Sequence, residues 1–271
     1  MIYKSYTIQD TSEILLGLLS IYPFESFEEH DTHMIAYIKE DELDEITTLE
    51  IHNTINGLGI DYTIETIEPQ NWNALWEASF DPVIIDEFCV IRADFHDTMP
   101  NIKHDIIINP KMAFGTGHHE TTFMMISAME KMGLSSKSVF DYGCGTGVLS
   151  ILASKLGAHP IDAIDIEEES YNNTIENAQT NNVTNINVAC SDLESFNVKE
   201  YDIILANINR KVLLFSADKL KTILKESGQL LLSGILDQDE KMIIDHYQSA
   251  GFTLLDKMEK GYWRCLKFGH N

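Results

Sequence analysis

Apolar and polar positions alternate with two different periods along the chain, and the pattern separates a short first part from a longer second part. In the second part, short apolar runs alternate with longer stretches of helical period, which is typical of a parallel sheet wound with helices. The expected strands are 139–141, 160–164, 186–189, 201–208 and 228–234, followed by a hairpin at 252–256 and 261–268. The pattern predicts an α/β fold with a doubly wound, seven-stranded, Rossmann-like sheet.

The first part has a different order of elements. Expected strands lie at 3–8, 24–28, 33–38 and 60–67, and expected helices at 12–19 and 41–58. This βαββαβ order is the ferredoxin-like plan, an α+β module. The predicted domains are therefore 1–68, a ferredoxin-like domain; 69–100, a linker in which Trp72 and Trp76 are expected to be packing anchors; and 101–271, the catalytic domain.

Three alternating glycines, Gly143, Gly145 and Gly147, directly follow the apolar run that ends at Asp141. Because glycine has no Cβ, such a turn lets a ligand lie against the backbone at the carboxyl end of a strand. A second acid, Asp165, ends the next apolar run, where a carboxylate suits the two hydroxyls of a ribose. The arrangement predicts a cofactor that contains a nucleoside.

The spacing of the turn discriminates between such cofactors. A dinucleotide site has the pattern Gly-x-Gly-x-x-Gly with a pyrophosphate on the helix N-terminus, whereas Val148 stands where the third glycine belongs. Acids flank the turn, which disfavours phosphate and suits a cationic sulfonium. We therefore expect S-adenosylmethionine. A nicotinamide-dependent oxidoreductase is the alternative, and it predicts NADH binding.

Further candidates follow from position in the predicted sheet. Asp192 comes after the third strand, where a carboxylate can meet the adenine amino group. Thr122 lies near the start of a helix, on the face with Met125 and Met129 that is expected to turn to the core. His118 and His119 are adjacent and have no matching ligand cluster elsewhere, so no metal site is expected.

Net charge and cysteine content limit which partners and which cellular compartment fit the protein. The formal net charge is −24, and residues 1–70 contain 15 acids against only Lys4 and Lys39. This argues against a nucleic-acid partner and suits a basic protein, although an acidic surface without any partner remains open. The four cysteines form no Cys-x-x-Cys pair, no apolar run is long enough to span a membrane, and the N-terminus lacks a signal-peptide pattern. We expect a cytoplasmic protein.

Four segments together resemble the ribosomal protein L11 methyltransferase family: Ala113-Phe-Gly-Thr-Gly-His-His-Glu-Thr-Thr122, Phe140-Asp-Tyr-Gly-Cys-Gly-Thr-Gly147, Ala163-Ile-Asp-Ile166 and Ala206-Asn-Ile208. The resemblance implies an S-adenosylmethionine-dependent enzyme that methylates amino groups of protein L11. It also implies that the N-terminal domain recognises the substrate and that the linker lets the catalytic domain reach several nitrogens. Carried over by position, the cofactor contacts of the family fall on Thr122, Gly143, Asp165 and Asn207.

Asn207 is also our candidate catalytic residue, expected to orient the amine through its side-chain or backbone carbonyl, while Phe114 excludes water. Gly145, Asp192 and Phe114 complete the expected cofactor contacts. Asn109-Pro-Lys111 and Asn207-Ile-Asn209 depart from the usual family pattern close to the acceptor, which leaves the target nitrogens open. A methyltransferase acting on another basic protein or a small amine, and a non-catalytic module that only binds the cofactor, remain as alternatives.

Overall fold

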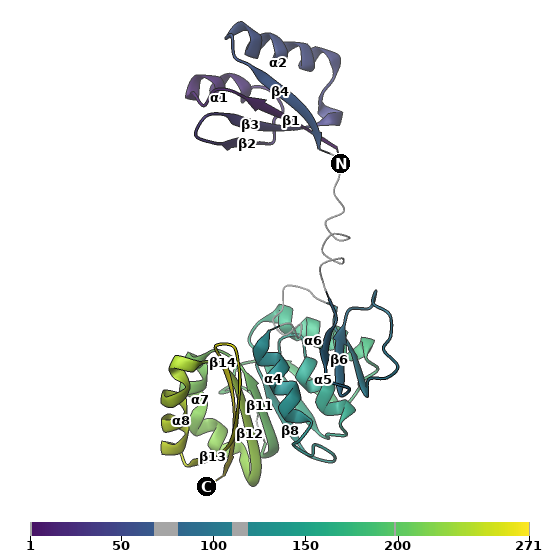
Figure 1. Ribbon diagram of the computed structural model, residues 1–271, viewed down its shortest axis with the longest axis vertical. Helices are drawn as coiled ribbons and strands as arrows, with labels where there is room; N and C mark the ends of the chain where they lie inside the picture. Colours follow the sequence, from purple (N-terminus) through teal and green to yellow (C-terminus); the bar gives the residue numbers. More distant parts are fainter. Residues whose placement is uncertain (1, 68–80, 110–118, 198, 271) are drawn as a thin grey trace. The chain divides into compact units, whose positions relative to one another are not determined.

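The chain divides into two compact units, Met1–Ala78 and Ser79–Asn271, each with a core of its own (Figure 1). The structure is a computed structural model that describes residues 2–67, 81–109, 119–197 and 199–270. Trp72, Trp76 and Phe114 fall outside these residues.

The first unit is a four-stranded antiparallel sheet with two helices. Its elements are β1 (Tyr3–Ile8), α1 (Glu13–Leu19), β2 (Ser26–Glu29), β3 (Met34–Lys39), the short 3₁₀ turn η1 (Glu40–Glu42), α2 (Glu45–Gly57) and β4 (Tyr62–Ile67). The sheet order is β2-β3-β1-β4, and the element order is that of the ferredoxin-like plan. Alternate residues of β1 and β3 share one core with α1 and α2, so both helices cover the same face of the sheet.

The helix expected over 41–58 is shorter in the structure. It begins at Glu45, because the side chain of Asp44 accepts a hydrogen bond from the Thr47 N–H and caps the first turn. Of its apolar residues, Ile51 and Ile55 are buried while Ile46 and Leu49 are exposed. The apolar face of α2 is therefore narrower than its sequence predicts.

The second unit contains the predicted seven-stranded sheet. Its elements are α4 (Glu120–Met129), β8 (Val139–Tyr142), α5 (Val148–Lys155), β9 (Ile161–Asp165), α6 (Glu168–Thr180), β10 (Ile186–Cys190), β11 (Tyr201–Asn207), α7 (Arg210–Ile223), β12 (Leu224–Leu236), η2 (Asp237–Asp239), α8 (Glu240–Ser249), β13 (Phe252–Lys260) and β14 (Trp263–His270). The strand order is β10-β9-β8-β11-β12-β14-β13. The first five strands are parallel and the final hairpin is antiparallel, which confirms the fold expected from the sequence.

Helices cover both faces of this sheet, with α4 and α5 on one side and α7 and α8 on the other (Figure 1). The period of two in β11 shows how the strands serve both cores: Ile203 and Leu205 pack with α4 and α5, whereas Ile204 and Ala206 pack with α7. Strands that are apolar on both faces belong in the middle of such a sandwich. The carboxyl ends of the parallel strands consequently meet along one edge.

A small three-stranded sheet precedes the large one. Strands β5 (Val83–Ile85), β6 (Cys89–Arg92) and β7 (His104–Ile107) pair in that order. Ile85, Ile91 and Ile106 join the core that contains α4 and α5. Part of the segment expected as a linker, 69–100, thus forms strands of the second unit.

Candidate functional site

A cavity of about 1330 Å³ lies at the carboxyl ends of the parallel strands, where α/β sheets generally bind ligands. Residues from the glycine turn, from the segments after β9 and β11, from α7 and from β14 line it. The lining includes Gly143, Gly145, Asp165, Asn207, His119 and Trp263.

The glycine turn makes the floor of the cavity. Gly143, Gly145 and Gly147 all have positive φ, of 76°, 55° and 77°, a conformation that glycine adopts without strain. The backbone N–H of Gly143 donates to the Ile164 carbonyl across 2.9 Å, which fixes the turn to the end of β9. A Cβ at Gly143 would lie 2.3 Å from Cγ2 of Ile208, so the turn also packs closely on the segment after β11.

Asp165 ends β9 and faces the same cavity. Its two carboxylate oxygens accept the backbone N–H groups of Gly145 and Glu167, each across 3.0 Å. These bonds hold the carboxylate beside the glycine turn, and each oxygen keeps a lone pair for a further donor. The side chain is thus positioned to accept hydrogen bonds from vicinal hydroxyls.

Asn207 ends β11, and its amide is held from one side only. Nδ2 donates to Oγ1 of Thr122, in the first turn of α4, across 3.2 Å. Oδ1 is buried and has no hydrogen-bond partner among the described residues. A buried carbonyl oxygen ordinarily has a donor, so this atom marks a position where a ligand N–H fits.

The structure brings four of the expected site residues to the cavity: Gly143, Gly145, Asp165 and Asn207. Thr122 is fully buried and reaches it through Asn207. Phe114 lies outside the described residues.

Asp192 is exposed and is not among the residues that line the cavity, although its neighbour Ser191 is. One of its oxygens accepts the Ser195 N–H across 2.7 Å. The hydrogen bonds from Ser195 hold the pKa of this carboxyl below its usual range.

Two aromatic residues of the cavity were not singled out as site residues from the sequence. His119 caps α4 and accepts from the Thr121 N–H, and its ring meets Trp263 edge to face with centroids 4.6 Å apart. In the sequence, His119 was weighed only as a metal ligand. No cluster of three or more metal-ligating side chains occurs in the described ranges. Trp263 starts the last strand, 56 positions after Asn207, and only the sheet order places it here.

Two ionisable groups lie beneath the turn. Burial raises the pKa of Asp141 to about 6, against the opposing hydrogen bond that Ser150 Oγ donates across 2.6 Å. Burial also raises the pKa of the Cys144 thiol, which therefore stays protonated at neutral pH and does not act as a nucleophile. Neither group is exposed to the cavity as a reactant.

The charges around the cavity favour a cation. Its described lining contains three carboxylates, Asp165, Glu167 and Glu169, and a single lysine, Lys211. A pyrophosphate would be repelled by this surface, whereas a sulfonium or an ammonium would be attracted. The site fits S-adenosylmethionine and an amine better than a dinucleotide.

Comparison with known proteins identifies the family. The sequence profile described as Ribosomal protein L11 methyltransferase matches residues 4–271. The chain belongs to this family. Curated relatives carry the same name: one from Porphyromonas gingivalis is 39% identical over 97% of this chain and 92% of its own. Another, from Chlorobaculum parvum, is 36% identical over 94% and 91%.

A solved structure agrees with this assignment. The ribosomal protein L11 methylase from Lactobacillus delbrueckii subsp. bulgaricus superimposes with a TM-score of 0.65 and 29% identity, over 70% of this chain and 99% of that one. A methyltransferase from Pyrococcus furiosus, at 14% identity and a TM-score of 0.52, shows that the fold is shared. The family resemblance expected from the motifs is confirmed.

Proposed function

We propose that this protein transfers methyl groups from S-adenosylmethionine to amino groups of ribosomal protein L11, on lysine side chains, on the N-terminal α-amine or on both. Membership in the family and the names of its relatives support this activity. The observation that carries the chemistry is the unpartnered Oδ1 of Asn207, a residue that lines the same cavity as the glycine turn and Asp165.

The residues present fit the cofactor. Asp165 would accept hydrogen bonds from the ribose hydroxyls, and the backbone at Gly143 and Gly145 would lie against the methionine end. The acidic lining favours the positive charge of the donor. S-adenosylmethionine supplies an electrophilic methyl group on its sulfonium.

The protein must present a neutral amine to that methyl group in line with the bond that breaks. A lysine of pKa about 10.4 requires roughly 4–5 kcal/mol to lose its proton at pH 7, whereas an α-amine requires only about 1 kcal/mol. We propose that Asn207 Oδ1 accepts an N–H of the amine and so aims its lone pair. Such positioning contributes several kcal/mol to lowering a barrier, so no strong base is needed.

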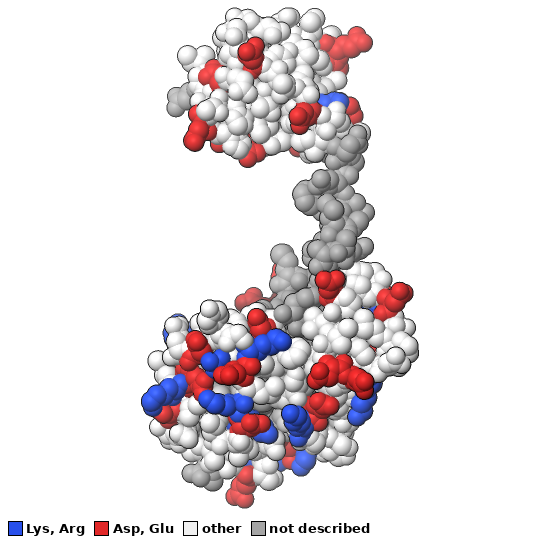
Figure 2. Space-filling view, in the orientation of Figure 1, with Lys and Arg blue, Asp and Glu red and all other residues white. Residues whose placement is uncertain are grey.

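The first unit is proposed to recognise the substrate. It carries much of the negative charge, and Figure 2 shows acidic side chains spread over its surface with little basic charge between them. Ribosomal proteins carry lysine and arginine to neutralise RNA phosphates, so an acidic surface complements them.

No helix in the described part of the chain is long and apolar enough to cross a bilayer. A cytoplasmic location, as expected from the reduced cysteines, is part of the proposal.

The deciding experiment is the intact mass of L11 from the same organism after incubation with this protein and S-adenosylmethionine. Methyl-sized steps that depend on the cofactor are expected, and fragment masses then locate the nitrogens. An unchanged L11 mass, with cofactor binding demonstrated in the same sample, would instead favour another basic protein or a small amine as substrate. Loss of cofactor binding itself would contradict the assignment of the site.

A further inference from the structure

Helix α6 turns polar side chains toward the interior of the second unit. Its buried residues are Ser170, Asn173, Thr174, Asn177 and Ala178, of which only the last is apolar. A helix that packs on a sheet ordinarily does so with an apolar stripe, because a buried amide or hydroxyl without a hydrogen bond costs free energy. The polar face of α6 therefore requires partners.

Those partners are backbone carbonyls of the glycine turn. Oγ1 of Thr174 donates to the Gly145 carbonyl, and Nδ2 of Asn177 donates to the Thr146 carbonyl, both across 2.9 Å. The contact is close, since a Cβ at Gly147 would lie 2.7 Å from Cγ2 of Thr174. The turn rests on α6 through two side-chain hydrogen bonds.

The carboxamide of Asn177 also holds a second segment of the chain. Its Oδ1 accepts the backbone N–H of Asn109, just beyond β7, across 3.2 Å. The remaining N–H donates to Oδ1 of Asn173, and the side chain is 1% exposed. Because one end meets a carbonyl and the other an N–H, the amide has a single satisfactory orientation.

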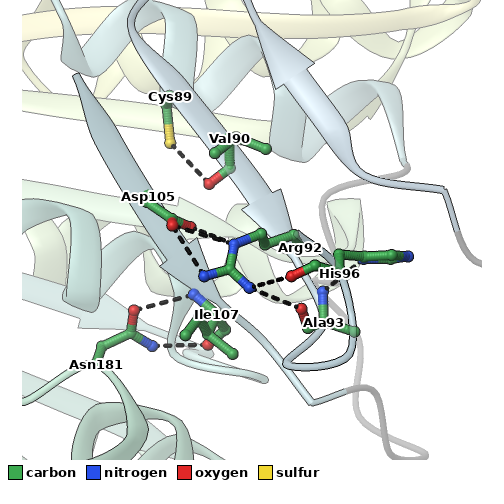
Figure 3. A network of polar contacts seen from close by, with 8 residues as sticks. All are labelled: Cys89, Val90, Arg92, Ala93, His96, Asp105, Ile107 and Asn181. Carbon is green, nitrogen blue, oxygen red and sulfur yellow. Dashed lines mark hydrogen bonds and ion pairs between the residues drawn. The ribbon is translucent and has the colours of Figure 1, made fainter. Parts of the chain in front are cut away.

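Asn181, one helical turn further on, bonds to β7 and to the backbone of α6 but not to the glycine turn; its Nδ2 donates to the Asn177 carbonyl across 2.8 Å. Its side chain accepts from the Ile107 N–H and donates to the Ile107 carbonyl, across 3.0 and 2.6 Å, in the manner of a neighbouring strand (Figure 3). Strand β7 is fixed on its other side by the buried guanidinium of Arg92, whose Nε and Nη2 both lie 2.9 Å from carboxylate oxygens of Asp105 (Figure 3). The Asn109 N–H that bonds to Asn177 therefore follows a strand that is held on both sides.

We propose that Asn177 is a positioning residue for the cofactor, whose amide braces the glycine turn against the chain beyond β7. Without it, the Thr146 carbonyl loses the donor that α6 supplies, and the Asn109 N–H loses its acceptor. Of the two hydrogen bonds from α6 to its carbonyls, the turn then keeps only the one from Thr174, so the backbone on which the cofactor lies is held less firmly. This inference rests on the proposed function, because it takes the glycine turn to be the cofactor site.

The test is S-adenosylhomocysteine binding by the full chain, measured by calorimetry. Asn177→Ala is expected to raise the dissociation constant about tenfold, the effect of one or two buried hydrogen bonds. The KM for S-adenosylmethionine should rise in parallel, while kcat at saturating cofactor and the KM for L11 stay within about twofold. Asn181→Ala is the matched control: it removes a buried asparagine at the C-cap of α6, whose side-chain bonds go to Ile107 and to the Asn177 carbonyl and not to the glycine turn. It should lower thermal stability and leave the dissociation constant unchanged.

Thr174→Val provides a second probe should Asn177→Ala fold poorly. It keeps the shape of the side chain, removes the donor to the Gly145 carbonyl, and should also weaken S-adenosylhomocysteine binding. Unchanged binding in both Asn177→Ala and Thr174→Val, or equal weakening by Asn181→Ala, would show that α6 acts only through general packing. A wild-type chain that does not bind S-adenosylhomocysteine would overturn the proposed function itself.

Discussion

Asn207 and Thr122 stand 85 positions apart in the sequence, and Nδ2 of the first donates to Oγ1 of the second across 3.2 Å. The bond ties the end of β11 to the first turn of α4. In this orientation Nδ2 faces Thr122, and Oδ1 is the buried atom without a partner among the described residues. The pair therefore holds the Asn207 amide in place between α4 and the end of β11.

Replacing Asn207 should impair turnover more than cofactor binding. Asn207→Ala removes the oxygen that orients the amine, and misplacement of a reacting group by about 1 Å costs roughly 100-fold in rate. We expect kcat for L11 to fall by about that factor, with S-adenosylhomocysteine affinity within about threefold of wild type. Thr122→Val keeps the shape of the side chain and removes the acceptor of the Asn207 amide. Its kcat should lie between those of wild type and Asn207→Ala. Equal losses of kcat and of affinity would make Asn207 a cofactor contact instead.

Asp165 should act mainly on cofactor affinity. Hydrogen bonds to a charged group are worth about 1.5–3 kcal/mol, so Asp165→Asn should weaken S-adenosylhomocysteine binding about 10- to 100-fold. Glu169→Gln removes the same charge from the lining of the same cavity. If the two variants lose affinity equally in a calorimetric titration, general charge rather than a specific contact with the ribose explains the effect.

The sequence predicted the large sheet and the residues at the carboxyl ends of its strands, for a physical reason. An apolar run indicates a buried strand, and the polar residue that follows it, Asp165 or Asn207, indicates where the strand ends. Since parallel strands present their carboxyl ends on one edge, residues at those positions must converge. The local pattern was therefore enough to predict that Gly143, Gly145, Asp165 and Asn207 lie close together.

The remainder of the site depends on contacts that a linear pattern does not contain. Trp263 reaches the cavity only because β14 pairs antiparallel with β12, and no local signal specifies that pairing. The polar face of α6 has the composition of a solvated helix, and only its contacts with the glycine turn show that Asn177 is buried. The residues Asp237-Gln-Asp-Glu240 have the pattern of a capping box that opens a helix. That prediction is wrong, because Asp237–Asp239 form a 3₁₀ turn and no side chain caps α8.

Gly234 should be essential for a steric reason. It has φ of +85°, and a Cβ there would lie 2.1 Å from the backbone oxygen of Ile208, directly after Asn207. Gly133 also has positive φ, +64°, but a Cβ would meet nothing within 4 Å. In urea unfolding we expect Gly133→Ala to cost about 1 kcal/mol and Gly234→Ala roughly 3–4 kcal/mol, since only the latter adds overlap to strain. Similar losses in the two variants would contradict the close approach.

Buried Asp141 should make stability depend on pH. Its folded pKa, about 6, exceeds the ordinary value of 3.8, so the folded state binds this proton more tightly than the unfolded state. The stabilising contribution is complete below the unfolded pKa and is lost as pH rises to the folded one, a change of about 3 kcal/mol.

Asp141→Asn removes that dependence. Its stability relative to wild type should therefore increase between about pH 4 and pH 7, as measured by urea unfolding at each pH. Ser150→Ala removes the hydrogen bond that lowers this pKa and should move the window to higher pH. A difference between Asp141→Asn and wild type that stays constant with pH would sink the assignment.

Acidic residues of the first unit should accelerate the encounter with L11. Asp41 and Glu42 are exposed in η1, and Asp218 and Glu226 are exposed in the second unit. Neutralising either pair with the matching amides changes the net charge of −24 equally, so the two double variants differ only in where the charge is lost. If the first unit attracts the basic substrate, Asp41→Asn with Glu42→Gln should lower kcat/KM for L11 several-fold at low salt, and the other pair should not.

The difference in kcat/KM between the two double variants should vanish near 1 M salt, where charges are screened within about 3 Å. Equal effects of the two pairs would assign the attraction to the total charge of the protein and would leave the first unit without a specific role in recognition.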